Sequence, residues 1–318
     1  FQMRSDLMRF TRTLMAAFSV AGLAACGSDD ITKVVEPAPF SSIRWVNAVP
    51  DTVAMDYRIV DYPSNASEPN LAFRASSGNW RNLPPGPHHI KVFFTNTTAA
   101  GTDVSVVSQV FVDTTLTFEQ GKKYTILHYG FAKTGATPKQ QLVLIEDVPP
   151  DPSAGQIGLR AINAAPALGA VNIYAIPATA VGGAASGTAT FSNLAPGAIA
   201  GWAGLTALPG PVAPSTTPPA TTYRIAVTPT TSTTPVADAL APPGQVGVPS
   251  TTVSGVVSQP IDPIAGTQQP LSDLTAVIFG PQVSYTLRTP AGGTVVVAAT
   301  TTGGVTVMLD KHPPRISP

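Results

Sequence analysis

Hydrophobic and polar residues alternate with a period of two along residues 41–152, which is the pattern of half-buried β-strands. Ile43 and Trp45 fall on one face of the first run, and Met55, Tyr57 and Ile59 repeat the arrangement in the next. Turn-forming Pro and Gly residues separate the runs, and no amphipathic helical pattern follows residue 26. The pattern predicts an all-β sandwich of about seven strands. The later alternating runs lie at 90–94, 104–111, 124–129 and 142–146.

Short blocks of sequence occur twice along the chain in the same order, which predicts an internal duplication. The first block, IRWVNAVP at 43–50, returns as LRAINAAP at 159–166, an offset of 116 residues. We therefore expect one β-sandwich copy at 41–152 and a second at 157–318. The other pairs are NLPPG (82–86) with NLAPG (193–197), YTILHYG (124–130) with LTAVIFG (274–280), and VLIEDVPP (143–150) with VMLDKHPP (307–314).

The second copy is longer than the first. The offset between paired blocks grows from 111 to 150, so about 39 residues are added between the second and third blocks. The addition coincides with residues 209–270, which are rich in Pro, Thr, Ala and Gly and have the composition of an exposed, mobile insertion. Thr221–Val227 is the exception, since its alternation predicts a strand.

Several short motifs mark the strands and turns of both copies. In the first copy they are Asn47-Ala48-Val49-Pro50, Met55-Asp56-Tyr57, Leu83-Pro84-Pro85-Gly86 and Gly121-Lys122-Lys123-Tyr124-Thr125, and in the second Asn163-Ala164-Ala165-Pro166, Val171-Asn172-Ile173-Tyr174 and Leu194-Ala195-Pro196-Gly197. The second copy lacks a clear counterpart of the last motif of the first, G-x-x-Y-T. These motifs resemble the DUF4397 family, and the resemblance implies extracytoplasmic, immunoglobulin-like β-sandwiches with no assigned biochemical role and no catalytic residues. The resemblance and the N-terminus together predict two tandem immunoglobulin-like β-sandwich domains after a lipoprotein signal peptide helix.

Residues 1–25 have the layout of a secretory signal peptide. Arg9 and Arg12 form a basic start, and Leu14–Ala25 is a mostly apolar run. That run is too short for the ~30 Å of a membrane span. Because residue 1 is Phe, we expect the start codon at Met3 or Met8.

The apolar run ends in Leu23-Ala24-Ala25-Cys26, which resembles the lipobox of bacterial lipoproteins. The resemblance implies that Cys26, the only cysteine, is lipidated after cleavage, and residues 26–40 then form a tether to the first domain. A buried or free cysteine is the alternative. Gly27 follows the cysteine where Asp would favour the inner membrane, so we expect a lipid anchor in the outer membrane, facing the periplasm or the cell surface.

Charge and cysteine content narrow the function classes. Only 11% of residues are charged, and removal of 1–25 leaves 15 basic and 17 acidic residues. No basic surplus is left to neutralise phosphates, so nucleic acid is excluded as a partner. With a single cysteine, no disulfide forms within the chain, and the fold depends on its hydrophobic cores.

Some polar residues recur between the copies. Asn47 and Asn163 precede Ala-x-Pro turns, where an Asn side chain can bond to the backbone two residues on. Arg44 and Arg160 lie on strands, where each could cover an aromatic ring, and Arg44 could instead pair with Asp56. We favour a structural role for these residues over a ligand site shared by both copies.

The histidines do not suggest a metal or cofactor site. His88 and His89 are adjacent, so on a strand they point to opposite faces and cannot chelate one metal together. His128 corresponds to Ile278 and has no paired ligand. Neither a G-x-S-x-G motif nor, once Cys26 is acylated, a free thiol is present for nucleophilic hydrolysis. We expect no metal and no cofactor.

Carboxylates and aromatic residues give the remaining candidates. Asp147 and Asp151 flank a Pro pair between the copies, and because the repeat aligns Asp147 with Lys311, no acidic pair recurs. A solvated edge between domains is the favoured interpretation. Trp80, Tyr129 and Trp202 could form a platform for stacking sugars, but core packing is the more frequent role of such residues.

We therefore expect a non-enzymatic, lipid-anchored cell-envelope protein that acts as a structural or binding module. Its partners would be the membrane, through the anchor, and an unidentified protein or glycan. Two alternatives stay open: a carbohydrate-binding module or adhesin, and an envelope enzyme with a loop site that the sequence does not reveal.

Overall fold

The computed structural model describes residues 39–315, apart from 63–65, 96–106, 211–220, 251, 254–255, 258–259 and 289–293. The expected signal peptide at 1–25, the lipobox with Cys26, and most of the tether at 26–40 lie outside the described residues.

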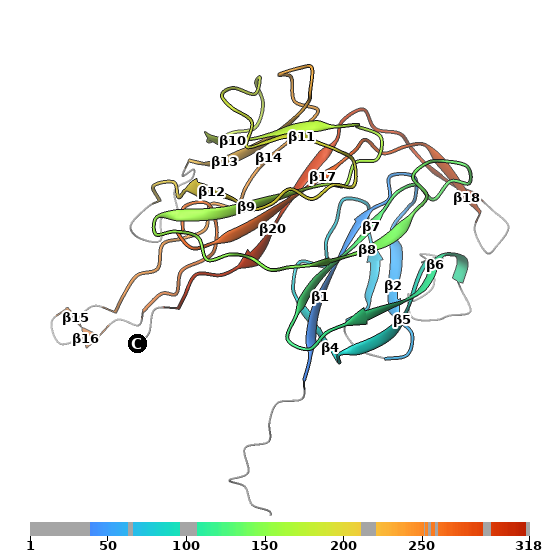
Figure 1. Cartoon of the computed structure of the whole chain (residues 1–318), viewed down its shortest axis with the longest axis horizontal. Helices are drawn as coiled ribbons and strands as arrows, with labels where there is room; N and C mark the ends of the chain where they lie inside the picture. The colour runs from blue at the N-terminus through green and yellow to red at the C-terminus, as the bar shows by residue number, and fades with distance from the viewer. Residues whose placement is uncertain are drawn as a thin grey trace, which may run out of the picture. The chain divides into compact units, whose positions relative to one another are not determined.

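The described chain is all-β and contains no helix, as the sequence predicts for the region after the signal peptide. Its first half forms two four-stranded sheets, β4-β1-β7-β8 and β3-β2-β5-β6. Figure 1 shows these strands together, in blue to green. Their bounds are β1 Ser41–Ala48, β2 Met55–Ile59, β3 Glu68–Leu71, β4 Arg81–Leu83, β5 Gly86–Thr95, β6 Val107–Phe118, β7 Lys123–Tyr129 and β8 Gln141–Glu146.

The second half also forms two four-stranded sheets, β12-β9-β17-β20 and β11-β10-β13-β14. Two short ribbons extend from it, β15 (Thr252–Val253) with β16 (Val256–Val257) and β18 (Tyr285–Arg288) with β19 (Thr294–Val297). The sheet strands are β9 Gln156–Asn163, β10 Val171–Ala178, β11 Phe191–Leu194, β12 Ala203–Thr206, β13 Thr222–Pro229, β14 Ala237–Leu240, β17 Asp273–Phe279 and β20 Gly304–Lys311.

Each half therefore has the architecture of a β-sandwich, as predicted, and the strand orders of the two halves correspond one to one. In each half the first strand runs parallel to a later strand, β1 to β7 and β9 to β17. The register also matches, since Arg44 lies beside Thr125 and Arg160 beside Thr275.

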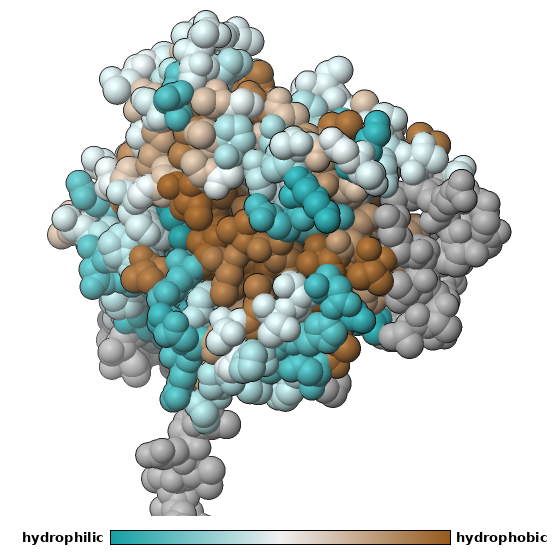
Figure 2. Space-filling model, turned by 45° about the vertical axis from the view of Figure 1, so that its right-hand side comes forward, coloured by the Kyte–Doolittle hydropathy of each residue, from teal (hydrophilic) through white to brown (hydrophobic). Residues whose placement is uncertain are grey.

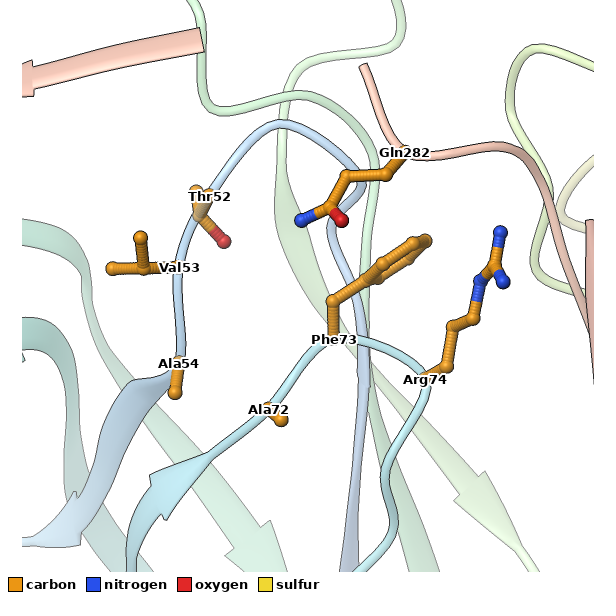
Figure 3. Close-up of a pocket in the computed structure, with 7 residues that line it drawn as sticks. All are labelled: Thr52, Val53, Ala54, Ala72, Phe73, Arg74 and Gln282. Carbon is orange, nitrogen blue, oxygen red and sulfur yellow. The ribbon is translucent and has the colours of Figure 1, made fainter. Parts of the chain in front are cut away.

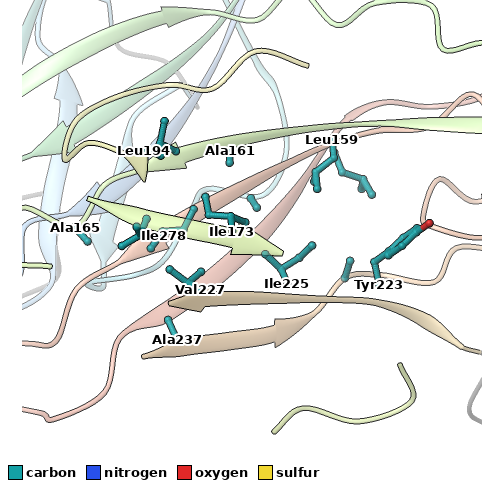
Figure 4. Packing of buried hydrophobic residues seen from close by; sticks show 14 of the residues in the cluster. Leu159, Ala161, Ala165, Ile173, Leu194, Tyr223, Ile225, Val227, Ala237 and Ile278 are labelled. Atoms are coloured by element: carbon teal, nitrogen blue, oxygen red, sulfur yellow. The ribbon is translucent and has the colours of Figure 1, made fainter. Parts of the chain in front are cut away.

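Alternation along the strands divides each sheet into two faces. In β9, the side chains of Ile157, Leu159 and Ala161 enter the core of the second sandwich, whereas Arg160 and Ile162 point to the opposite face. Figure 4 shows how β9, β10, β13 and β17 supply that core. The core of the first sandwich is built in the same way around Ile43, Trp45, Met55, Tyr57, Ile90, Val92 and Ile126.

A third apolar cluster joins the two sandwiches. Most of its side chains come from the outward faces of β1 and β7 and those of β9 and β17, and β8 and β20 contribute one each. In each sandwich, one sheet is therefore buried on both faces. This explains why β1, β7, β9 and β17 are buried along nearly their whole length. The cluster is formed by Val46, Ala48, Leu127, Tyr129, Ile145, Ile162, Ala164, Val277, Phe279 and Met308.

The structure corrects one pairing of repeated blocks. Asn193 and Leu194 lie in β11 beside β10, the place that Asn70 and Leu71 occupy in β3 beside β2. The backbone N–H of Asn70 donates to Asp56 Oδ1 (2.7 Å), and Asn193 N–H donates in the same way to the side chain at the corresponding position of β10 (2.9 Å). The predicted match of 193–197 with 82–86 is therefore wrong. Both segments contain Asn-Leu before a turn, and this similarity misled the comparison.

The stretch at 209–270 contains regular structure as well as insertion. The predicted strand at Thr221–Val227 is confirmed as β13, and β14 follows it as the edge strand of the same sheet. The longer connections lie on either side of this strand pair, before β13 and between β14 and β17.

We predict that His128 makes the first sandwich sensitive to acid. The imidazole is buried between Tyr57 Oη and Gln140 Oε1, each 3.0 Å away, and burial lowers the pKa of His128 from 6.5 to about 3. The unfolded chain therefore binds a proton that the folded chain does not, so stability should fall as pH decreases from about 6.5 toward 3. At pH 5 the loss should be about 2 kcal/mol in the free energy of urea-induced unfolding.

The matched control is the double variant Tyr57→Phe/His128→Ile, which installs an apolar pair and removes the titrating group. Its free energy of unfolding should change less between pH 7 and pH 5 than that of the wild-type protein. Equal changes in the two proteins would contradict the prediction.

Candidate functional site

The arginines that recur in the sequence meet at the junction of the two sandwiches. Arg44 and Arg160 lie on β1 and β9, and alternation turns both side chains away from their own cores and toward the other sandwich. Both are buried, with 0% and 4% of their surface exposed. A guanidinium group buried to this degree requires acceptors and a counter-charge.

Arg44 receives its counter-charge from across the junction and its acceptors from both sandwiches. Its Nε donates to Thr125 Oγ1 (2.7 Å) in its own sandwich, and its Nη1 donates to the carbonyl oxygen of Leu309 (3.1 Å) in the other. Its Nη2 forms a hydrogen bond and ion pair with Asp310 Oδ1. The arginine of the first sandwich is thereby neutralised by a carboxylate of the second.

Arg160 repeats this arrangement in the opposite direction. Its Nε donates to Thr275 Oγ1 (2.9 Å) in its own sandwich, and its Nη2 pairs with Asp147 Oδ1 of the first sandwich. The two ion pairs therefore cross the junction in a nearly symmetric exchange.

The threonines close the network. Thr125 Oγ1 donates to Asp147 Oδ2, and Thr275 Oγ1 donates to Asp310 Oδ2, each at 2.6 Å. Burial raises the pKa of Asp310, although the positive charge of Arg44 opposes this shift. We call this set the junction network: Arg44, Thr125, Asp147, Arg160, Thr275 and Asp310.

A tryptophan covers each arginine of the network. The Arg44 guanidinium carbon lies 4.3 Å from the ring centroid of Trp80, and that of Arg160 lies 4.9 Å from the ring centroid of Trp202. The prediction that each arginine covers an aromatic ring is confirmed. The alternative pairing of Arg44 with Asp56 is wrong, because the carboxylates that pair with Arg44 are Asp310 and, at 3.6 Å, Asp147.

The aromatic platform suggested by the sequence is not assembled. Tyr129 is only 5% exposed and lies in the apolar cluster between the sandwiches, while Trp80 and Trp202 are half-buried over the guanidinium groups. Trp80 also has Lys123 Nζ 5.4 Å from its ring centroid. These rings stabilise the junction instead of presenting a continuous stacking surface.

The interpretation of Asp147 as part of a solvated edge is wrong. The residue is 5% exposed, and its counterpart is Asp310, not Lys311. The repeat comparison missed this because the pairing of β17 with β20 shifts by one residue beside Asp273. Asp151, by contrast, is exposed and forms an ion pair with Lys311.

The threonines of the network were not singled out from the sequence. Thr125 and Thr275 occupy matching positions in YTILHYG and LTAVIFG, runs that are otherwise mostly apolar. A polar residue repeated at an outward position of a buried strand is the signal that could have identified them.

Asp273 departs from the symmetry of the network. In the second sandwich it occupies the position that Lys123 has in the first. It is buried, and neither oxygen of its carboxylate has a hydrogen-bond partner among the described residues. Burial raises the pKa of Asp273 to about 6. Gly158 leaves the room for this carboxylate, since a Cβ at Gly158 would lie 1.9 Å from Asp273 Oδ1.

The asparagines act as predicted. Asn47 Oδ1 accepts the N–H of Val49 (3.1 Å), and Asn163 Oδ1 accepts the N–H of Ala165 (3.2 Å). Each therefore fixes the turn after the first strand of its sandwich.

The structure does not bring the histidines together. His88 bonds to Asp61 Oδ2 and to the carbonyl oxygen of Pro84, both at 2.9 Å, whereas His89 Nε2 contacts Asp113 (2.5 Å). Within the described ranges, no group of three or more His, Cys, Asp or Glu side chains is arranged to hold a metal ion. That same part of the chain contains no helix with the length and hydropathy of a membrane span.

A pocket of about 340 Å³ opens at the junction (Figure 3). It is lined by the loop that follows β1, by the loop that follows β3, and by one residue of the second sandwich. Because both sandwiches line it, the pocket depends on how the junction network holds them together. The lining residues are Thr52, Val53, Ala54, Ala72, Phe73, Arg74 and Gln282.

Comparison with known families finds one domain. Residues 41–174 match DUF4397, described as a domain of unknown function. The match begins at the first residue of β1, covers the whole first sandwich, and continues through β9 into β10. Among curated proteins, no match to the chain is found.

We predict that Arg44→Met strongly destabilises the protein. The substitution leaves the buried charges of Asp147 and Asp310 with only one arginine, and removal of one partner from a buried pair costs about 3–5 kcal/mol. The free energy of urea-induced unfolding measures this loss.

Lys122→Met is the matched control, because Lys122 pairs with Glu119 and Glu146 at the surface. The free energy of unfolding should change little, because exposed ion pairs contribute little to stability. A loss for Arg44→Met no larger than that of the control would show that Asp147 and Asp310 do not depend on Arg44 for charge compensation.

Proposed function

We propose, starting from the DUF4397 domain at residues 41–174, that this chain is a non-enzymatic, lipid-anchored protein of the cell envelope. Its two sandwiches would act as one rigid structural or binding module, with the second sandwich as a further copy of the first. The observation that carries the proposal is the junction network, because it joins the two sandwiches through buried, mutually compensating charges.

The correspondence between the sandwiches supports a tandem copy. Both have the same strand order, the same parallel pair of strands, and an Asn that fixes the following turn. Both also place an Arg beside a Thr and under a Trp. Chance similarity of two unrelated sandwiches does not account for this coincidence of side chains.

The N-terminal sequence supports the anchor. Leu23-Ala24-Ala25-Cys26 has the form of a lipobox, and Gly27 at the following position favours the outer membrane, facing the periplasm or the cell surface. Two or more acyl chains give stable membrane attachment, since each buried methylene contributes about 0.8 kcal/mol.

The distribution of charge and apolar surface supports binding or structure over catalysis. The four charges of the junction network neutralise one another and are buried. Figure 2 shows a face on which apolar side chains gather near the middle, with hydrophilic side chains around them. Apolar surface gathered in this way is typical of interaction sites.

A binding role for carbohydrate, as an adhesin or carbohydrate-binding module, is favoured by one observation, the pocket at the junction. It brings an aromatic ring, an amide and a hydroxyl to one place through Phe73, Gln282 and Thr52. Ligand pockets combine apolar walls with a few polar groups in this manner.

We predict that Cys26→Ser abolishes acylation of the chain. Wild-type protein expressed in a bacterial host should incorporate labelled palmitate, sediment with membranes, and have an intact mass that shows loss of residues 1–25 and gain of acyl groups. The variant should carry no label and keep its N-terminal segment, because Cys26 is the only thiol in the chain.

Ala25→Gly is the control, since it keeps a small residue before the cysteine and should leave labelling unchanged. Wild-type protein without label, or with residues 1–25 still attached, would refute the lipid anchor.

A further inference from the structure

The junction pocket contains a cation whose charge the fold does not neutralise. Arg74 Nη2 donates to the carbonyl oxygens of Gly280 (2.8 Å) and Thr302 (2.5 Å), which are neutral acceptors. No carboxylate lies within ion-pair distance of Arg74 in the described part of the chain, and its buried Nε has no hydrogen-bond acceptor there. Burial lowers the pKa of Arg74, as expected for a charge removed from water without a counter-ion.

The nearest acid in the sequence of the lining loops does not supply that counter-ion. Asp51 precedes Thr52 but is 1% exposed, and its carboxylate accepts the backbone N–H groups of Ala132 (2.9 Å) and Lys133 (2.8 Å). The pocket is therefore positive on one wall, and an anionic group placed there would be favoured.

Arg74 also occupies a backbone position that suits glycine. Its φ is +69°, and Gly197 holds the corresponding position in the second sandwich with a φ of +77°. The equivalence is shown by matching hydrogen bonds, because Arg74 N–H donates to Asn47 O (2.9 Å) and Gly197 N–H donates to Asn163 O (2.7 Å). A side chain at φ > 0 strains the backbone, so the contacts of the Arg74 side chain must offset that strain.

The two sides of the junction have different surroundings at this position. A Cβ at Gly197 would lie in van der Waals contact with the ring of Tyr129, at 3.4 Å. At Arg74, the facing residue of β20 is Gly304, and the absence of its side chain gives the guanidinium space.

The other lining groups suit a hydroxylated ring. Figure 3 shows the side chains of Gln282 and Thr52 directed toward the same space as the ring of Phe73. The side-chain amide of Gln282 makes no hydrogen bond among the described residues, whereas Thr52 is fully buried and its Oγ1 donates to Val49 O (3.5 Å). An aromatic face with a free amide group beside it can bind the C–H face and a hydroxyl of a pyranose.

We propose that this pocket binds a hexuronic acid unit of an acidic polysaccharide. The carboxylate would pair with Arg74, the ring would lie against Phe73, and the side-chain amide of Gln282 would bond to its hydroxyls. The volume of about 340 Å³ falls at the lower end of the range for small-molecule sites, which fits one sugar unit. The proposal rests on the proposed function in one respect, namely that the sandwiches serve as a binding module.

The test measures binding of galacturonate and glucuronate to the full chain, purified from membranes in detergent, by saturation-transfer NMR and calorimetry. Galactose and glucose are the matched probes, since they lack only the carboxylate. We expect each uronate to bind about tenfold more tightly than its neutral counterpart, the difference that one charge-assisted contact supplies.

Variants locate the site. Arg74→Gln should remove the preference for uronate, and Arg74→Lys should keep part of it. Because Arg74 also contacts the second sandwich, Gln282→Ala provides a variant that leaves that contact intact and should weaken uronate binding about fivefold. Lys91→Gln, which removes a cation elsewhere on the surface, should bind like wild type.

Equal binding of uronates and neutral sugars, no binding of either, or a short peptide carboxylate that binds more tightly than the uronates would overturn the proposal. The Cys26→Ser chain distinguishes this failure from failure of the proposed function. Uronate binding should be the same with and without acylation, whereas palmitate labelling reports the anchor alone.

Discussion

Two ion pairs that cross between the sandwiches, Arg44 with Asp310 and Arg160 with Asp147, are the constraint on which the rest of this structure depends. Burying these four charges without partners would destabilise the fold severely, because removing each ion from water costs several kcal/mol. Across the junction they neutralise one another, and Thr125 and Thr275 satisfy the remaining oxygens. Such a network adds little net stability, yet it excludes any other arrangement of the two sandwiches, since a shifted contact would leave charges buried and unpaired.

Positions at which the two sandwiches carry the same residue and positions at which they differ have different consequences. Where the sandwiches match, as at Arg44 and Arg160, the residues serve the junction that both share. Where they differ, the chain has a property on one side only. The buried His128 faces Tyr57 in the first sandwich, while Ile278 and Ile173 occupy these places in the second. Similarly, Arg74 stands where the second sandwich has Gly197, and its side chain lines the pocket.

Much of the fold could be predicted from the sequence. Alternation along β1, β2 and β7 identified strands because those strands have a core face that requires apolar residues. The repeated blocks located both sandwiches because turn residues such as Asn47 and Asn163 have a fixed backbone role. The repeat of Asn-Leu misled the comparison at 193–197, where only strand pairing distinguishes β11 from the segment before β5.

The junction could not be predicted in the same way. The sequence showed that Arg44 and Arg160 recur, but their partners, Asp310 and Asp147, lie 266 and 13 residues away along the chain. A one-residue shift in the pairing of β20 hid the correspondence of the two aspartates. Contacts between sandwiches depend on how outward faces meet, and neither periodicity nor composition records that geometry.

The central claim is that the junction network makes the two sandwiches one cooperative unit. Differential scanning calorimetry of the full chain tests it most directly, by comparing the calorimetric enthalpy of unfolding with the van't Hoff enthalpy. The account predicts a single transition in which the two enthalpies agree. Two separable transitions, or a calorimetric enthalpy near twice the van't Hoff value, would show that the sandwiches unfold independently and would contradict it.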